Sequence, residues 1–188
     1  MRAFIAITLP ANVHESLGAL QRELAASQAD VKWVAPGQLH LTLKFLGEIS
    51  EAERRAVEAI LVRIAAWHGA FRLRLGGLGV FPGSGPPRVV WVGVSEGAEA
   101  VRGLAESIEQ EGRAIPLRGE ERPLTAHLTL GRVRSSKGRR ELLERIRSAR
   151  WTPPPPWLVT SVTFFESVLR PGGPQHTVLA DVPIAAQR

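Results

Sequence analysis

Cysteine and tyrosine are absent from this chain of 188 residues, and its only lysines are Lys32, Lys44 and Lys137. Without cysteine there is no disulfide, no thiolate metal ligand and no cysteine nucleophile, so catalysis must use histidine, hydroxyl, carboxylate or basic side chains. The absence of cysteine also fits a reducing compartment. We therefore expect a cytoplasmic protein.

Long hydrophobic runs are missing as well. No stretch approaches the roughly 18 apolar residues that a membrane-spanning helix needs. The first ten residues have too short an apolar run, and no small-residue cleavage site, for a secretory signal. The composition, with 44% hydrophobic, 22% charged and 6% aromatic residues, is typical of one compact soluble domain. We expect no association with membranes.

Positive charge is in modest excess. Lys and Arg number 24 against 18 Asp and Glu, which leaves a net charge of +6. Such an excess favours an anionic partner such as nucleic acid, and the guanidinium fork of arginine matches phosphate oxygens well. A coding bias towards arginine gives the same count, so the charge is weak evidence for a nucleic-acid partner.

Helical and extended segments alternate along the whole chain. Ser50 with Glu53 is a capping-box signature at the start of one predicted helix. No linker is long enough to separate independent domains, so residues 1–188 are expected to form a single domain. The spacing of apolar residues predicts helices around residues 13–24, 57–64, 101–108 and 142–146, and strands around residues 4–9, 31–34, 39–46, 71–80, 89–94, 128–133, 158–169 and 178–184.

One tetrapeptide occurs twice, as His40-Leu41-Thr42-Leu43 and as His127-Leu128-Thr129-Leu130. The odds of such a recurrence by chance are roughly one in several hundred. Side chains alternate along a strand, so the His and Thr of each motif share one face while the leucines point into a core. If the two strands belong to equivalent halves of a duplicated unit, two histidines and two threonines face one cleft.

This set of side chains suits cleavage of a phosphodiester by acid–base catalysis. One group must take a proton from the attacking oxygen and another must give one to the leaving oxygen. Imidazole, with an ordinary pKa of about 6.5, does both, and each transfer is typically worth about 10² to 10⁴ in rate. Threonine hydroxyls can donate to the non-bridging oxygens, where charge develops. A structural role for both histidines is the alternative, and the pairing of the motifs argues against it.

A zinc site is a second alternative, but two histidines are an incomplete ligand set, and no Asp or Glu flanks either motif at ligand spacing. The stretch Gly76-Gly77-Leu78-Gly79 lacks the spacing, the following helix and the lysine of a phosphate-binding P-loop. We therefore expect neither a metal nor another cofactor.

Two basic residues follow the motifs. Lys44 has the same alternation as the His and Thr of the first motif, so it is expected beside them as a contact to the nucleotide backbone. Arg132 follows the second motif and is the second residue expected to bind the substrate, although simple alternation places it on the face opposite that motif's histidine unless Gly131 sits in a bulge.

The motifs and their surroundings resemble the 2H phosphoesterase superfamily, and in particular the RNA 2′,3′-cyclic phosphodiesterases formerly called 2′-5′ RNA ligases. The likeness runs nearly end to end. It implies an α+β, bilobal, duplicated fold, in which two antiparallel sheets face a central cleft, helices pack outside, and each lobe carries one HxTx motif (40–43 and 127–130). The matching segments are residues 4–10, 31–34, 40–47, 79–82, 87–94, 122–132, 166–169 and 171–174.

The same resemblance implies a function. The chain is expected to hydrolyse RNA 2′,3′-cyclic phosphate ends to 2′-phosphomonoesters without a metal, with 2′-5′ ligation as the reverse reaction. By this resemblance His40 donates a proton to the leaving 3′ oxygen, His127 activates water, and Thr42 and Thr129 hold the phosphate. RNA ends, tRNA fragments among them, are the expected substrates of a monomer. The alternative is a non-catalytic module that holds RNA phosphate in the same cleft.

The sequence departs from the family pattern at two positions. Ala126 precedes the second motif where relatives usually have proline, and this change removes no functional group. His176 stands near the place where relatives commonly carry tyrosine, and it is expected either to take over the aromatic role or to change recognition there. Arg88 and Arg122 flank matching segments and are expected either to add positive charge to the cleft or to be ordinary surface residues.

Overall fold

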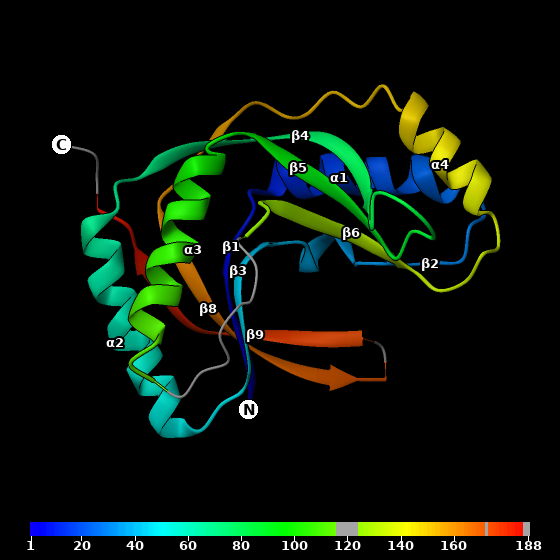
Figure 1. Cartoon of the computed structure of the whole chain (residues 1–188). Coiled ribbons are helices and arrows are strands. Elements are labelled where there is room, and N and C mark those ends of the chain that lie inside the picture. Colours follow the sequence, from blue (N-terminus) through cyan, green and yellow to red (C-terminus); the bar gives the residue numbers. More distant parts are fainter. Residues whose placement is uncertain (116–123, 172, 186–188) are drawn as a thin grey trace.

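The computed structural model describes residues 1–115, 124–171 and 173–185, which form two antiparallel sheets and four α-helices (Figure 1). The helices are α1 (Ala11–Ala25), α2 (Glu51–Trp67), α3 (Ala98–Gly112) and α4 (Arg139–Ser148), with a short 3₁₀ helix η1 (Pro36–Gln38). The strands are β1 (Arg2–Ile7), β2 (Val31–Trp33), β3 (Leu41–Glu48), β4 (Phe71–Phe81), β5 (Val89–Glu96), β6 (His127–Val133), β7 (Trp157–Val159), β8 (Ser161–Arg170) and β9 (Gly173–Pro183).

Each sheet combines strands from both halves of the chain. The first sheet has the order β3-β1-β8-β9, so two early strands lie beside the two last ones. The second sheet has the order β2-β6-β5-β4-β7. The first HxTx motif therefore leads into an edge strand of one sheet, and the second motif opens a strand inside the other sheet.

Helices pack against one face of each sheet. In the first sheet, α3 contacts β3, and α2 contacts β8 and β9. At the other end of the molecule α1 and α4 contact one another, and α4 contacts β4 of the second sheet (Figure 1). Leu17 and Leu20 of α1, Leu61 of α2 and Leu104 of α3 are all buried in one continuous apolar cluster. Burial of these helix faces leaves the opposite faces of the sheets for the functional side chains.

The elements predicted from periodicity are present, with two differences. The segment expected as one strand over residues 158–169 is two strands, because the chain crosses at Thr160 from the second sheet, where Val159 pairs with Phe71, to the first. His40 lies just before β3 and not within it. The capping box is confirmed, since the Ser50 side chain accepts from the Glu53 backbone and the Glu53 side chain accepts from the Ser50 backbone.

Candidate active site

Each motif histidine is held by the backbone oxygen two residues before it. His40 Nδ1 lies 2.8 Å from the oxygen of Gln38, and His127 Nδ1 lies 2.6 Å from the oxygen of Thr125. Because a carbonyl oxygen only accepts, we assign the hydrogen to Nδ1 in both rings. With the hydrogen on Nδ1, Nε2 is the ring atom that exchanges a proton with a substrate, and it is the same imidazole atom in both motifs.

His40 lies in a cluster of aromatic rings. Its ring stacks on Phe4 with centroids 4.6 Å apart and meets His176 edge-on at 5.4 Å. Burial lowers the pKa of His40 to about 4; the bond to the Gln38 carbonyl opposes this, and the charges of His176 and His14 add to it. His40 is therefore neutral in the ligand-free protein near pH 7.

His176 belongs to the aromatic cluster around His40. Its ring also meets Phe4 edge-on at 4.9 Å, and burial lowers its pKa. The His176 Nδ1 atom is buried and has no hydrogen-bond partner among the residues that the structure describes. His176 is thus part of the wall against which His40 packs.

His127 has its own aromatic neighbours in the second sheet. Phe81 meets the His127 ring edge-on at 5.0 Å and stacks on Trp91 at 5.1 Å. Trp91 is paired across the strands with Thr129. The indole lies over Gly79, where a Cβ atom would overlap the ring. A glycine at position 79 is therefore required for Trp91 to lie flat beside the second motif.

A β-bulge lies at the last residue of the first motif. The register of β1 and β3 pairs Thr42 with Ala6 and Lys44 with the preceding residue of β1, so Leu43 is an extra residue in β3. An extra residue reverses the alternation of faces beyond it. Lys44 consequently points to the helix side, where it is 3% exposed and forms an ion pair with Glu109 of α3. The prediction that Lys44 lies beside the motif is wrong, because strict alternation does not survive the bulge.

A matching bulge lies at the last residue of the second motif, and it brings the basic residue Arg132 to the motif face, whereas the first bulge turns Lys44 away from it. The register pairs Thr129 with Trp91 and Gly131 with the preceding residue of β5, so Leu130 is the extra residue. Arg132 thereby returns to the face of Thr129 and is exposed there. Of the two other arginines considered above, Arg88 is exposed just before β5, and Arg122 lies outside the described residues.

Phe45 is the counterpart of Arg132 in the first half, because each follows its motif threonine by three residues and lies beyond the bulge. Phe45 pairs with Phe4, whose ring stacks on that of His40, and Phe45 is 58% exposed. Sequence alternation did not reveal Phe45, since strict counting places it on the buried face. An alignment of the two repeats that continues past the last leucine of each motif pairs Phe45 with Arg132, and this pairing is the sequence signal for Phe45.

Two glutamines that the sequence analysis missed brace the motifs. Gln38, whose carbonyl holds His40, also donates through its side chain to the Pro174 oxygen in β9. Gln21 of α1 is 6% exposed and donates to two backbone oxygens at 2.7 and 2.9 Å, the second belonging to Leu130. Leu130 is the bulged residue, so Gln21 stabilises the bulge in β6. No local pattern marks either glutamine.

The two motif strands meet in space, since β3 and β6 contact one another. Both His–Thr pairs therefore lie near the junction of the two sheets. Within the described parts of the chain, no group of three or more His, Cys, Asp or Glu residues is placed to hold a metal ion. The described helices also include none that is long and apolar enough to cross a membrane.

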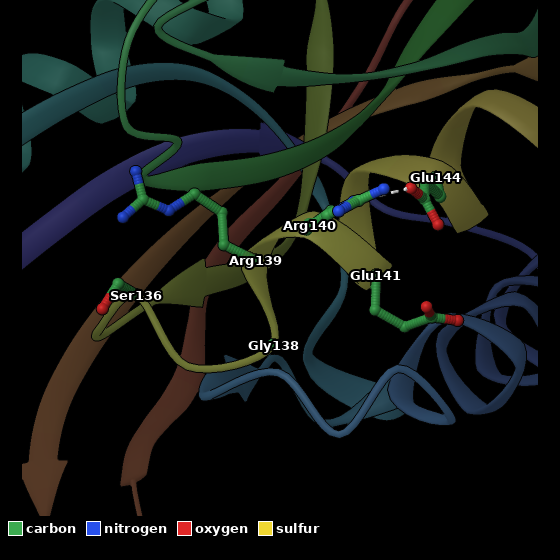
Figure 2. A pocket seen from close by; sticks show the side chains of 6 residues that line it. All are labelled: Ser136, Gly138, Arg139, Arg140, Glu141 and Glu144. Atoms are coloured by element: carbon green, nitrogen blue, oxygen red, sulfur yellow. Dashed lines mark hydrogen bonds and ion pairs between the residues drawn. The ribbon is translucent and has the colours of Figure 1, made fainter.

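A separate hollow lies at the start of α4 (Figure 2). Arg140 forms an ion pair with Glu144 at 3.1 Å, while the side chain of Arg139 points away from this pair. No motif residue lines the hollow, so it is distinct from the histidine site. Its lining residues are Ser136, Gly138, Arg139, Arg140, Glu141 and Glu144.

Both halves of the chain match one family model. The model described as LigT like Phosphoesterase matches residues 7–91 and again residues 92–175, so each match contains one HxTx motif. The chain belongs to this family. The resemblance to 2H phosphoesterases and the expected α+β fold with two antiparallel sheets are thereby confirmed.

Relatives of this LigT-like phosphoesterase cover nearly its whole length. The RNA 2′,3′-cyclic phosphodiesterase of Methanothermobacter thermautotrophicus is 34% identical over 177 residues, which are 94% of this chain and 95% of the relative. The crystal structure of TT0787 of Thermus thermophilus matches with a TM-score of 0.83 at 31% identity, over 100% of both chains. E. coli LigT complexed with 3′-AMP matches with a TM-score of 0.79 at 28% identity, over 97% of both chains.

Proposed function

We propose that this chain is an RNA 2′,3′-cyclic phosphodiesterase that produces 2′-phosphomonoesters by two-histidine catalysis without a metal ion. One observation carries the proposal: two histidines, each with Nδ1 held by the carbonyl two residues back and each followed two residues later by a threonine, lie at the starts of two strands that contact one another. The family match and the name of the archaeal relative support the choice of substrate.

In the proposed reaction, His127 Nε2 takes a proton from water as the water oxygen attacks phosphorus opposite the 3′ oxygen. The bond between phosphorus and the 3′ oxygen breaks, and that oxygen receives a proton from His40 Nε2. The product carries a 2′-phosphate and a 3′ hydroxyl, and solvent exchange restores both imidazoles. Thr42 and Thr129 donate to the non-bridging oxygens, where charge develops. A 5′ hydroxyl in place of water gives a 2′-5′ linkage.

The acid role of His40 couples substrate binding to proton uptake. With a pKa of about 4, roughly one His40 in a thousand is protonated at pH 7 in the ligand-free protein. A bound phosphate places negative charge beside the ring, which favours the imidazolium and raises its pKa. Binding of the substrate therefore favours the protonated form of His40, which is the form that donates the proton in the cleavage step.

The proposal also covers the two basic residues after the motifs, the domain organisation, and the compartment and substrates of the protein. Arg132, on the face of Thr129, contacts the substrate, whereas Lys44 is engaged by Glu109 and does not. Residues 1–188 act as one bilobal unit, which the mixing of both chain halves in each sheet supports. We further propose a cytoplasmic monomer that acts on RNA ends, tRNA fragments among them.

The test is turnover of adenosine 2′,3′-cyclic phosphate in excess chelator by wild type, His40→Asn and His127→Asn. Asparagine keeps an N–H that can replace the Nδ1 donor but cannot transfer a proton. We expect the 2′-phosphate isomer from wild type, identified by ³¹P NMR, and a loss of about 10²-fold or more in each variant. The control His68→Gln, at a ring that bonds to Ser107 away from the motifs, retains turnover.

Two results would contradict the proposal. A folded wild type that binds RNA but turns over no cyclic phosphate is a binding module, and its RNA affinity survives both motif substitutions and falls steeply with salt. Activity that disappears in chelator and returns with a divalent cation belongs to a metallohydrolase.

A further inference from the structure

Strands β2 and β6 place two cations directly opposite each other. The register pairs Lys32 with Arg132, and both side chains are exposed. Directly opposite residues in such a ladder have Cβ atoms roughly 4.5 to 5.5 Å apart, and like charges there are destabilising. Neither residue takes part in the ion pairs formed by the described part of the chain.

The next pair on the same face carries opposite charges. The Arg134 backbone N–H donates to the Asp30 backbone oxygen at 2.8 Å, so these two residues lie across from each other beyond the Val31–Val133 pair. This row continues the pairing of Lys32 with Arg132 but lies farther from the second motif. Among the paired rows of β2 and β6, two like charges therefore face each other only at Lys32 and Arg132.

Both cations lie on the face of the proposed active site. The bulge in β6 puts Arg132 on the face of Thr129, and Lys32 shares that face as its cross-strand partner. Arg132 pairs with Val89 and Thr129 pairs with Trp91, two residues farther along β5. Arg132 therefore lies roughly 7 Å along the sheet from Thr129. This spacing is comparable to that of neighbouring phosphates in an extended RNA strand.

We propose that Lys32 and Arg132 together bind the phosphate on the 5′ side of the terminal nucleotide, while the motif threonines hold its cyclic phosphate. The inference rests on the proposed function. In an RNA that ends in a 2′,3′-cyclic phosphate, every other phosphate lies towards the 5′ end, so the adjacent site receives this one. A guanidinium fork and an ammonium group on one phosphate make charge-assisted bonds, and the anion offsets their mutual repulsion.

The consequence is a substrate preference. The protein acts on RNA ends, or on nucleotides that carry a 5′ phosphate, better than on nucleoside 2′,3′-cyclic phosphates with a free 5′ hydroxyl. The competing explanation is that β2 is an edge strand, and edge strands carry lysine to prevent pairing with other chains. If Lys32 only prevents pairing with other chains, its substitution changes kcat/KM for the two substrates equally.

The experiment compares kcat/KM for adenosine 2′,3′-cyclic phosphate with that for its 5′-phosphorylated form. We expect wild type to prefer the 5′-phosphorylated substrate by roughly tenfold or more, and Lys32→Gln to reduce this preference about tenfold, as expected for one lost charge-assisted bond. Lys137→Gln removes an equal charge from an exposed lysine outside the ladder and keeps the preference. Because the two substrates differ by one phosphate, their slopes of log kcat/KM against log salt differ by about 0.7 in wild type.

A second readout tests the repulsion directly. In buffer without phosphate, Lys32→Gln removes one of two facing like charges, so its urea midpoint is equal to or higher than that of wild type. A lower midpoint overturns the inference that the two cations repel each other.

Four kinetic outcomes also overturn the inference. They are a wild type without preference, an equal loss on both substrates in Lys32→Gln, a preference unchanged in Lys32→Gln, and an equal loss of preference in Lys137→Gln. Each leaves the proposed function standing, because the substrate with a free 5′ hydroxyl is still turned over. Failure of wild type on both substrates overturns the proposed function and this inference together.

Discussion

Burial of His40 makes the stability of the protein depend on pH. The pKa of His40 is lowered to about 4 in the folded protein, whereas a histidine in an unfolded chain titrates at about 6.5. Between these values the unfolded chain binds a proton that the folded protein does not. The free energy of unfolding therefore falls as the pH decreases. For these two pKa values, the loss due to His40 between pH 7 and pH 5 is about 2 kcal/mol.

Urea unfolding at pH 7 and pH 5 measures this loss. Wild type is expected to lose about 2 kcal/mol more than His40→Asn, because asparagine does not titrate. Burial also lowers the pKa values of His68 and His176, but both contribute to wild type and variant alike. Hydrogen bonds lower the pKa values of Glu51 and Glu53, so these carboxylates titrate below the window. An equal loss in both proteins would refute the reasoning, since His40 would then be free to take up a proton in the folded state.

Three further substitutions test the supports of the site. Gln21→Leu removes the side-chain donor to the Val34 oxygen and one of the two donors to the Leu130 oxygen, which keeps the backbone N–H of Val34. We expect denaturation to show a loss of roughly 1 to 3 kcal/mol, and kinetics a lower preference for the 5′-phosphorylated substrate. Lys44→Met leaves Glu109, whose side chain is 25% exposed, without this partner. We expect a loss of roughly 1 to 3 kcal/mol of stability, while turnover per folded molecule persists. Loss of turnover at unchanged stability would show that Lys44 acts in the active site. Ser50→Ala removes the cap of α2 and costs about 1 kcal/mol with turnover unchanged, and an unchanged melting temperature would contradict the role of the cap.

The motifs themselves were predictable from the sequence. Two copies of His-Leu-Thr-Leu, in segments with strand periodicity, imply two imidazoles and two hydroxyls on uncovered faces with leucines beneath. Leu128 and Leu130 are fully buried, while His127 and Thr129 are only partly so. This much follows from local alternation, and the capping box of α2 follows from local hydrogen bonding in the same way.

The positions beyond each motif were not predictable, because bulges change the count. At the bulge in β6, the Leu130 oxygen accepts from Gln21, a residue of a distant helix, and from the backbone N–H of Val34. Lys44 is buried and its partner Glu109 lies in α3, far along the chain. The outcomes for Lys44 and Phe45 are therefore set by tertiary hydrogen bonds and ion pairs, which short sequence windows do not contain. The lowered pKa of His40 likewise depends on Phe4 and His176, which only the assembled sheet brings to it.

The exchange of strands between the two halves has a consequence for the order in which the protein is made. β4 belongs to the first family match but lies in the sheet of the second motif, and β8 belongs to the second match but lies beside β1. As the chain leaves the ribosome, β1 and β3 emerge before β4 to β7, yet β8 and β9, which complete their sheet, emerge after these strands. The sheet beside His40 is therefore completed only once β8 and β9 have been made, and until then β1 keeps an unpaired edge at which other chains can pair.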